Sequence, residues 1–317
     1  MSVLSLSTPL RGHAAVVLSQ LEREIAAGTL AHGILLCGPQ GIGKATLAFA
    51  LAQKLLGEGV GVEARIRAGS HPDLLVISRP YDEKKEEFAK DIPVEQTRKI
   101  AEFLSLTAGE GAWRVVIIDG ADAMNMSAAN SILKILEEPP PNSVLILVAH
   151  QASRLLPTIR SRCRTTRVAP LSEDDFTEVM RHALPDLSRE HGRRLGELSD
   201  YAPGLALTLH EQEALDMQDQ MELIFAGLPR IAHERVLAMA EQVGSGKQHA
   251  NWQLFSRLAL HWMARQAHIT GSSHWAEGWQ QTSQTFATCE ARHLDYKSAV
   301  ISFFHSLPNL QPTARSA

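Results

Sequence analysis

The sequence predicts an α/β domain with a parallel sheet, followed by two helical domains. In the first half, short β-branched or leucine-rich runs alternate with helix-like segments, which is typical of parallel strands with helices on both faces. After Pro170 the strand-like runs cease and helical periodicity continues. A chain of 317 residues is long enough for two or three domains. We place their boundaries at 1–168, 169–209 and 210–317.

Four buried strands and several helices are expected in the first domain. The strands share short length and polar neighbours, which is typical of strands buried on both faces. They are residues 33–37, 74–77, 115–118 and 144–148. Apolar side chains at helical spacing predict helices over 93–104 and 127–136, and three prolines at 139–141 end the second helix because proline lacks an amide donor. The charged segment 81–90 predicts a solvated loop.

A glycine-rich loop follows the first expected strand. Residues 38–45 are Gly-Pro-Gln-Gly-Ile-Gly-Lys-Ala, and an apolar helix comes next. The glycines allow backbone N–H groups to close round a phosphate, and the lysine can reach the β- and γ-phosphates. The loop's candidate nucleotide ligands are Gly38, Gly41, Gly43 and Lys44. Because Ala45 stands where Ser or Thr would coordinate magnesium, the loop predicts the fold more strongly than it predicts hydrolysis.

A carboxylate completes the expected nucleotide site. Asp119 directly follows the expected strand 115–118. At this position its carboxylate would bind magnesium through water. The next residue is Gly120, which cannot polarise an attacking water as a glutamate would. Asp122 follows, and we expect it to cap the next helix rather than to act as a base. The site is therefore predicted to be degenerate, with no metal assigned to it.

Composition narrows the classes of function. The net charge of −4 gives no global attraction to nucleic acid or anionic membranes. The three cysteines lie far apart, which suggests neither a disulfide framework nor a zinc site. The start of the sequence has no leader-like pattern and no run of about 20 apolar residues occurs, so we expect a cytoplasmic protein. Aromatic side chains along 252–263 predict a core face rather than a surface for stacking bases.

Two further segments complete a pattern that identifies a family. Residues 136–140 are Leu-Glu-Glu-Pro-Pro, and residues 161–163 are Ser-Arg-Cys. Together with the glycine-rich loop, they resemble the AAA+ clamp-loader subunits of DNA replication. The resemblance implies an α/β AAA+ P-loop domain at 1–168, a small helical lid at 169–209, and an all-α collar at 210–317 through which subunits assemble.

The departures from that family imply a subunit without intrinsic ATPase activity. Ala45 removes a metal ligand and Gly120 the base, while Leu205 stands where active subunits carry a lid arginine. Metal binding, water activation and charge neutralisation each contribute strongly to phosphoryl transfer, so their combined loss argues against turnover. In this family, Arg162 of the Ser-Arg-Cys motif would act as an arginine finger in trans, because a planar guanidinium grips phosphate oxygens well.

The resemblance therefore implies a non-hydrolysing stator within the DNA polymerase III holoenzyme. It would support ATP-dependent loading of the sliding clamp onto primed DNA. Its implied partners are the clamp-loader ATPase subunits, the delta-type subunit, the sliding clamp and, in the assembled complex, primed DNA. Arg98 lies in a helix that resembles one facing DNA, although a solvated helix face is the stronger interpretation for that residue alone.

No cofactor is required by this interpretation. ATP binding is expected to be weak or non-hydrolytic. No zinc is expected, because residues 57–71 lack the four cysteines that many relatives carry there. Two alternatives stay open: an active AAA+ ATPase with a non-standard metal ligand and catalytic base, and a DNA-binding protein that needs no partner.

Overall fold

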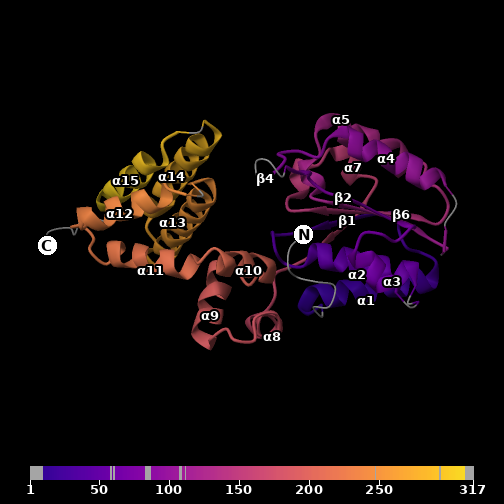
Figure 1. Ribbon diagram of the computed structural model, residues 1–317, viewed down its shortest axis with the longest axis horizontal. Helices are drawn as coiled ribbons and strands as arrows, with labels where there is room; N and C mark the ends of the chain where they lie inside the picture. Colours follow the sequence, from indigo (N-terminus) through magenta and orange to yellow (C-terminus); the bar gives the residue numbers. More distant parts are fainter. Residues whose placement is uncertain are drawn as a thin grey trace. The chain divides into compact units, whose positions relative to one another are not determined.

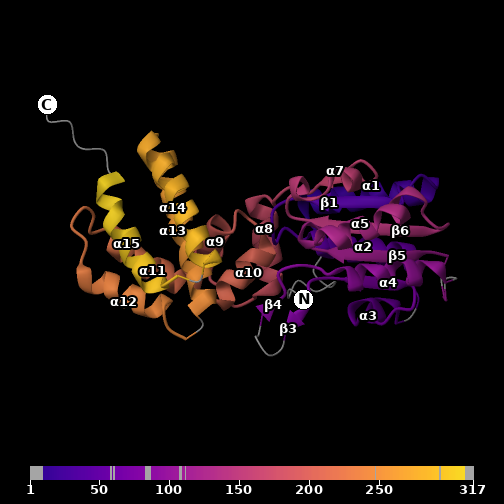
Figure 2. The same cartoon turned by 90° about the horizontal axis from the view of Figure 1, so that it is seen from above.

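Two compact units make up the chain. The structure is a computed structural model that describes residues 10–310 except 58, 60, 83–86, 107–108, 111, 247 and 293. The first unit is Met1–Leu207 and the second is Thr208–Ala317, and Figures 1 and 2 show their elements from two directions. Among the described residues, none of the helices is both long and apolar enough to cross a lipid bilayer.

A five-stranded parallel sheet forms the centre of the first unit. In spatial order its strands are β2 (Leu74–Ile77), β5 (Arg114–Asp119), β6 (Ser143–Ala149), β1 (Gly33–Cys37) and β7 (Arg164–Arg167). Every neighbouring pair is parallel, with Leu35 of β1 opposite Leu147 of β6. The four strands expected from the sequence are confirmed to within one residue at each end.

The fifth strand, β7, was not expected from the sequence. Its residues are Arg-Thr-Thr-Arg, and most of them are exposed. β7 pairs only with β1, so it lies at the edge of the sheet. Charged side chains are common on edge strands because they discourage pairing with another chain. A strand without apolar residues gives no periodic hydrophobic signal, which is why pattern analysis missed it.

Helices cover both faces of the sheet (Figure 1). On one face lie α1 (Gly12–Ala27), α2 (Lys44–Leu56) and α3 (Val62–Arg67). On the other lie α4 (Val94–Ser105), α5 (Met126–Ser131), α6 (Leu133–Glu137) and α7 (Pro157–Arg160). Successive strand side chains point to opposite faces, so Leu36 joins the first apolar layer and Leu35 the second. Burial on both faces explains the uninterrupted apolar strands.

Two local expectations in this unit were wrong. The helix expected over 127–136 is divided into α5 and α6 at Ile132, whose φ of −91° and ψ of −9° interrupt the regular helix. The segment 81–90 contains a two-stranded hairpin, β3 (Tyr81–Asp82) and β4 (Glu87–Phe88), although residues 83–86 lie outside the described part. The rings of Tyr81 and Phe88 meet edge to face across the hairpin, and this contact offsets the charge of the surrounding sequence.

Three helices follow the sheet. They are α8 (Glu173–Ala183), α9 (Arg189–Leu198) and α10 (Pro203–Glu211). Ser172 caps α8, because its side chain accepts a hydrogen bond from the amide of Asp175. Pro203 begins α10, and Asp200 and Tyr201 just before it have positive φ. The two compact units divide inside α10, so the expected lid and collar boundaries stay predictions.

The second unit is entirely helical in its described part. It contains α11 (Ala214–Phe225), α12 (His233–Val243), α13 (Gln248–Thr270), α14 (Ser273–Ala291) and α15 (Tyr296–Ser306). The aromatic stripe on α13 is a core face, as expected: Trp252 is 1% exposed, Phe255 is fully buried, and Trp252 stacks on Tyr296 with the ring centroids 4.8 Å apart.

We predict that the sheet core is sensitive to truncation. Ile146 of β6 is fully buried, so Ile146→Ala should lower the free energy of unfolding by about 2–5 kcal/mol, the cost of lost burial and a residual cavity. Urea denaturation followed by circular dichroism would measure this change. Val16→Ala on α1, where the side chain is 61% exposed, should stay within about 0.5 kcal/mol of the unaltered chain. Equal decreases in the free energy of unfolding for both variants would contradict the placement of Ile146 in the core and of Val16 at the surface.

Candidate functional site

The candidate nucleotide site lies where ligands bind in open parallel sheets, outside the carboxyl ends of the strands. The glycine-rich loop joins β1 to α2, Asp119 ends β5, and His150 follows β6 directly. The candidate glycines have φ of +152° (Gly38), +80° (Gly41) and +90° (Gly43). Such values are rare for residues with a Cβ, so the loop has the backbone freedom predicted from its sequence.

Lys44 is folded back onto its own loop. Its Nζ donates hydrogen bonds to the carbonyl oxygens of Gly38 at 2.8 Å and Pro39 at 2.5 Å, and to Nδ1 of His150 at 3.2 Å. An ammonium group has three donors, and all three are used here. The residue is only 3% exposed. In this conformation Lys44 has no proton left for a phosphate oxygen.

His150 is a site residue that the sequence analysis missed. The available signal was its place directly after a buried strand that neighbours both β1 and β5. Partial desolvation of the imidazole, followed by the charge of Lys44, lowers the pKa of His150. The neutral ring can therefore accept a hydrogen bond at Nδ1, which is the role that the Lys44 contact requires.

The two carboxylates near the loop have different roles. Burial raises the pKa of Asp119, although the charges of His150 and Lys44 act in the opposite sense. The Oδ2 atom of Asp122 accepts hydrogen bonds from the backbone amides of His150 and Gln151, both at 3.2 Å. The expectation that Asp122 caps the next helix was wrong, because Asn125 caps α5. Asp122 instead holds the turn that presents His150.

The start of α10 packs directly on the glycine-rich loop. The amide of Gly204 donates to the carbonyl oxygen of Gly41 at 2.8 Å. A Cβ on Gly41 would lie 2.4 Å from the backbone nitrogen of Leu205, so only glycine fits this approach. Leu205, at the expected arginine position, packs against the apolar layer that contains α2. The loop is thus covered by backbone and an apolar side chain.

Gly120 is also constrained by its backbone. Its φ is +82°, a conformation in which any residue with a Cβ is strained. A glutamate placed there would therefore be disfavoured as well as newly charged. The backbone of the turn after β5 therefore favours glycine at this position.

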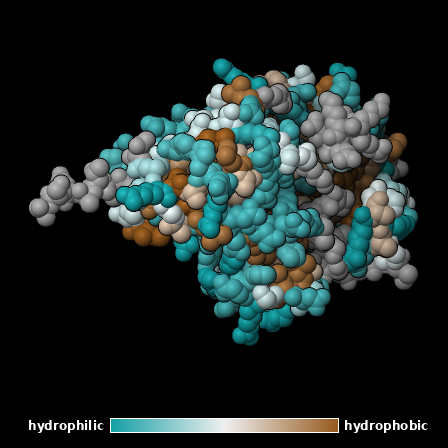
Figure 3. Space-filling model, turned by 60° about the vertical axis from the view of Figure 1, so that its left-hand side comes forward, coloured by the Kyte–Doolittle hydropathy of each residue, from teal (hydrophilic) through white to brown (hydrophobic). Residues whose placement is uncertain are grey.

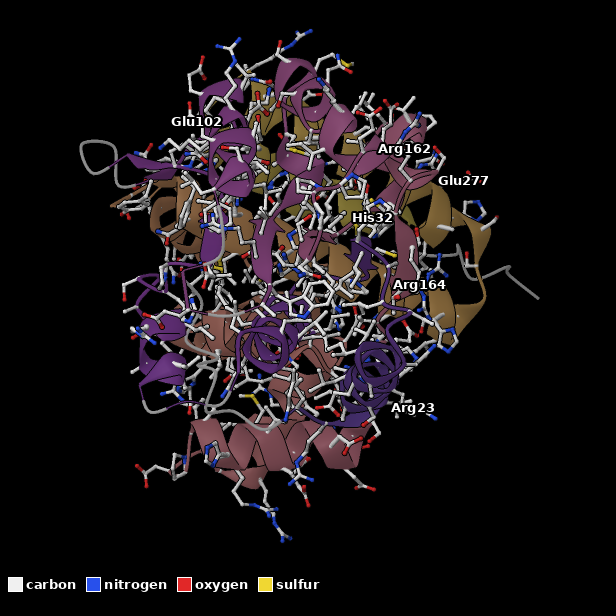
Figure 4. The ribbon with its side chains drawn as sticks, turned by 90° about the vertical axis from the view of Figure 1, so that its right-hand side faces the viewer. Arg23, His32, Glu102, Arg162, Arg164 and Glu277 are labelled. Atoms are coloured by element: carbon white, nitrogen blue, oxygen red, sulfur yellow. The ribbon has the colours of Figure 1, made fainter. Side chains whose placement is uncertain are left out.

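Arg162 lies at the other end of the sheet. It precedes β7, whose first residue, Arg164, pairs with Ile34 near the start of β1, whereas the glycine-rich loop follows the end of β1. The side chain of Arg162 is 34% exposed. Figure 4 shows Arg162 and Arg164 along the same edge of the unit. The structure therefore brings Lys44, Asp119 and His150 together and leaves Arg162 apart from them.

Hydrogen bonds and packing fix the backbone around Arg162. Cys163 is buried in the apolar layer beneath, and burial raises its thiol pKa to about 11, so this cysteine anchors the turn as a neutral thiol. A Cβ on Gly33 would lie 3.1 Å from the carbonyl oxygen of Arg162. His32, labelled beside Arg162 in Figure 4, has Nε2 2.9 Å from the carbonyl oxygen of Leu136, to which it donates.

The pKa of Lys44 gives a prediction for stability. Burial lowers this pKa from 10.5 to about 8, so between these pH values the unfolded chain binds more protons than the folded one, and the free energy of unfolding rises with pH. We expect the chain to gain about 2 kcal/mol relative to Lys44→Met between pH 7.5 and pH 10. Urea denaturation of both proteins across that range measures the difference, and a pH-independent difference would show that Lys44 titrates normally.

The comparisons with known proteins agree with this geometry. A family model described as "DNA polymerase III, delta subunit" matches residues 13–172. A DNA polymerase III subunit delta' from Pseudomonas aeruginosa is 38% identical over 218 residues, covering 66% of this chain and 63% of that protein. The subunit delta' of Bacillus subtilis is 34% identical over 163 residues, covering 49% and 47%. The matched part thus spans about half to two thirds of these relatives.

A solved structure supports the fold. A DNA polymerase III gamma subunit-related protein from Thermotoga maritima matches with a TM-score of 0.53 and 17% identity, covering 92% of this chain and 98% of that one. At that identity the likeness concerns the fold alone, and it confirms the expected AAA+ domain with a helical C-terminal part. From the family match, the relatives and the fold, the chain belongs to the delta-prime family of DNA polymerase III clamp-loader subunits.

Proposed function

We propose that this chain is a non-hydrolysing subunit of the DNA polymerase III clamp loader that supplies Arg162 to the ATP site of a neighbouring ATPase subunit. The placement of Arg162 carries the proposal. The guanidinium is partly exposed at the opposite end of β1 from the chain's own glycine-rich loop. A cation in that position cannot serve its own loop, but it can contact a γ-phosphate held by another subunit.

The chain's own site supports the absence of turnover. Lys44 is engaged by the loop and His150, and Asp122 is engaged by two backbone amides. Neither Ala45 nor Gly120 offers a polar side chain, and the start of α10 covers Gly41. ATP binding at this site is accordingly weak or absent and is not followed by hydrolysis.

The second unit is the proposed site of subunit assembly. Several of its large apolar side chains are exposed, including Leu223 at 57%, Ile269 at 64% and Leu294 at 50%. Figure 3 shows hydrophobic side chains in separate patches on a mainly hydrophilic face. We propose that these exposed side chains contribute to contacts with other subunits. The proposed partners are the ATPase subunits and the delta-type subunit, with the sliding clamp and primed DNA in the full complex in the cytoplasm.

The segment where many relatives carry a zinc module supports a metal-free fold. Arg65 of α3 makes two hydrogen bonds, each 2.7 Å long, to the carboxylate of Glu110. Asp73 accepts hydrogen bonds from the amides of Gly109 and Glu110. These contacts tie α3 to the loop before β5, and we propose that they stabilise this segment in place of a zinc module.

We predict that Arg162→Ala lowers the DNA-stimulated ATPase activity of a reconstituted clamp loader. An arginine finger supplied in trans raises the rate of ATP hydrolysis at the neighbouring site by about 10³- to 10⁵-fold. Hydrolysis at that site should therefore nearly cease, while other sites continue. Arg23→Ala removes an exposed arginine on α1, away from Arg162 (Figure 4), and should leave the rate unchanged. Full activity of Arg162→Ala in a correctly assembled complex would rule out the finger.

The isolated chain should show no magnesium-dependent ATP hydrolysis above the level of Lys44→Ala. The physical reason is the combined absence of a metal ligand, a base and a free lysine. Phosphate release from the purified chain would measure this activity. Hydrolysis that Lys44→Ala abolishes would instead favour the active-ATPase alternative.

A further inference from the structure

The hydrogen-bonding capacity of Arg162 is already largely used within this chain. Its Nη2 lies 2.6 Å from Oε1 of Glu137. Its Nη1 donates to the carbonyl oxygen of Thr158 at 3.0 Å and contacts Oγ of Ser161 at 3.4 Å. A guanidinium grips a phosphate through two of its nitrogen atoms in parallel. Each terminal nitrogen therefore already has a partner with which a phosphate group would compete.

Glu137 is held at this position by the local fold. It is the last residue of α6, and the prolines that follow prevent the helix from continuing. The preceding carbonyl oxygen, that of Leu136, accepts a hydrogen bond from His32 at the start of β1. A Cβ on Gly33 would lie 3.0 Å from Leu136 and 3.1 Å from the carbonyl oxygen of Arg162. The end of α6 and the Arg162 backbone thus pack against the same point of β1, which places the two side chains within reach of each other.

We propose that Glu137 holds Arg162 in a parked position and competes with the phosphate of the neighbouring subunit's ATP for its guanidinium. This inference rests on the proposed function of Arg162 and adds a positioning residue to it. When the neighbour's site is empty, the carboxylate neutralises the arginine. When ATP is present, the triphosphate draws the guanidinium from Glu137 to the shared site.

The strengths of the two contacts permit this exchange. The Arg162 side chain is 34% exposed and that of Glu137 is 49% exposed, so water and salt screen the pair and it contributes little. A triphosphate carries more negative charge and accepts two parallel hydrogen bonds from arginine. The pair is therefore weak enough to break and strong enough to lower the apparent affinity for ATP by a small factor.

Glu137→Gln tests the parked position in the reconstituted clamp loader with primed DNA and sliding clamp. The neutral side chain keeps the shape of glutamate but no longer competes as an anion, so the KM for ATP should fall by about two- to five-fold, the factor that an exposed ion pair supplies. The kcat should stay unchanged, because Arg162 reaches the same final position. Glu137→Ala, which removes the acceptor entirely, should lower the KM at least as much.

Two further variants make the result specific. Glu138→Gln changes the same charge one residue along the chain, where no ion pair with Arg162 occurs among the described residues, and should leave the KM unchanged. In the Arg162→Ala background, Glu137→Gln should have no effect, since its partner is gone. Melting temperatures of the purified variants would confirm that each chain is folded.

The alternatives give different outcomes. An unchanged or raised KM for both Glu137 variants, or a lowered kcat, would overturn the parked position. If Arg162→Ala lowers the ATPase activity in the same assay, the proposed role of Arg162 in the neighbouring site is retained. If Arg162→Ala has no effect, the proposed function fails together with the inference, so the two failures are distinguishable.

Discussion

The direction of β1 is the constraint on which the functional arrangement depends. Because β1 is parallel to both of its neighbours, its carboxyl end must lie beside those of β6 and β7, and its amino end beside theirs. The loop that follows β1 therefore lies near Asp119 and His150 at the carboxyl end of the strands. The turn before β7 places Arg162 at their amino end. Five strand residues span about 16 Å, so one short strand separates the chain's own site from its exposed cation.

At the carboxyl end of β1, the buried cation Lys44 is stabilised by groups of the protein itself. A lysine that loses water must find other acceptors, since an unpaired buried charge is costly. Lys44 finds two loop carbonyl oxygens and the neutral ring of His150. Asp122 supports the arrangement indirectly, because it holds the amide of His150. The lysine is thus turned inward, and its three hydrogen-bond partners all come from this chain.

The sequence predicted those features of the fold that depend only on residues close together in the chain. The four apolar strands and the aromatic core of α13 each follow from side-chain periodicity, and each is confirmed. Features that depend on distant contacts were missed. β7 has no apolar residue, His150 gains its role only through Lys44, and Asp122 binds amides 28 and 29 residues later in the chain. Local patterns carry no information about such partners, because they arise only when the sheet brings the strand ends together.

The contact between the start of α10 and the glycine-rich loop bears on how far these two segments can move apart. In an ATPase that cycles, the lid must exchange contacts when nucleotide binds and leaves. Here Gly204 is hydrogen-bonded to Gly41, and Leu205 packs where a charged sensor would stand. A ligand can shift a conformational equilibrium only by its differential affinity for the two states, and Leu205 offers a phosphate no charged group. The start of α10 therefore packs on the loop at the carboxyl end of β1, while the turn that carries Arg162 lies at the amino end of the same strand.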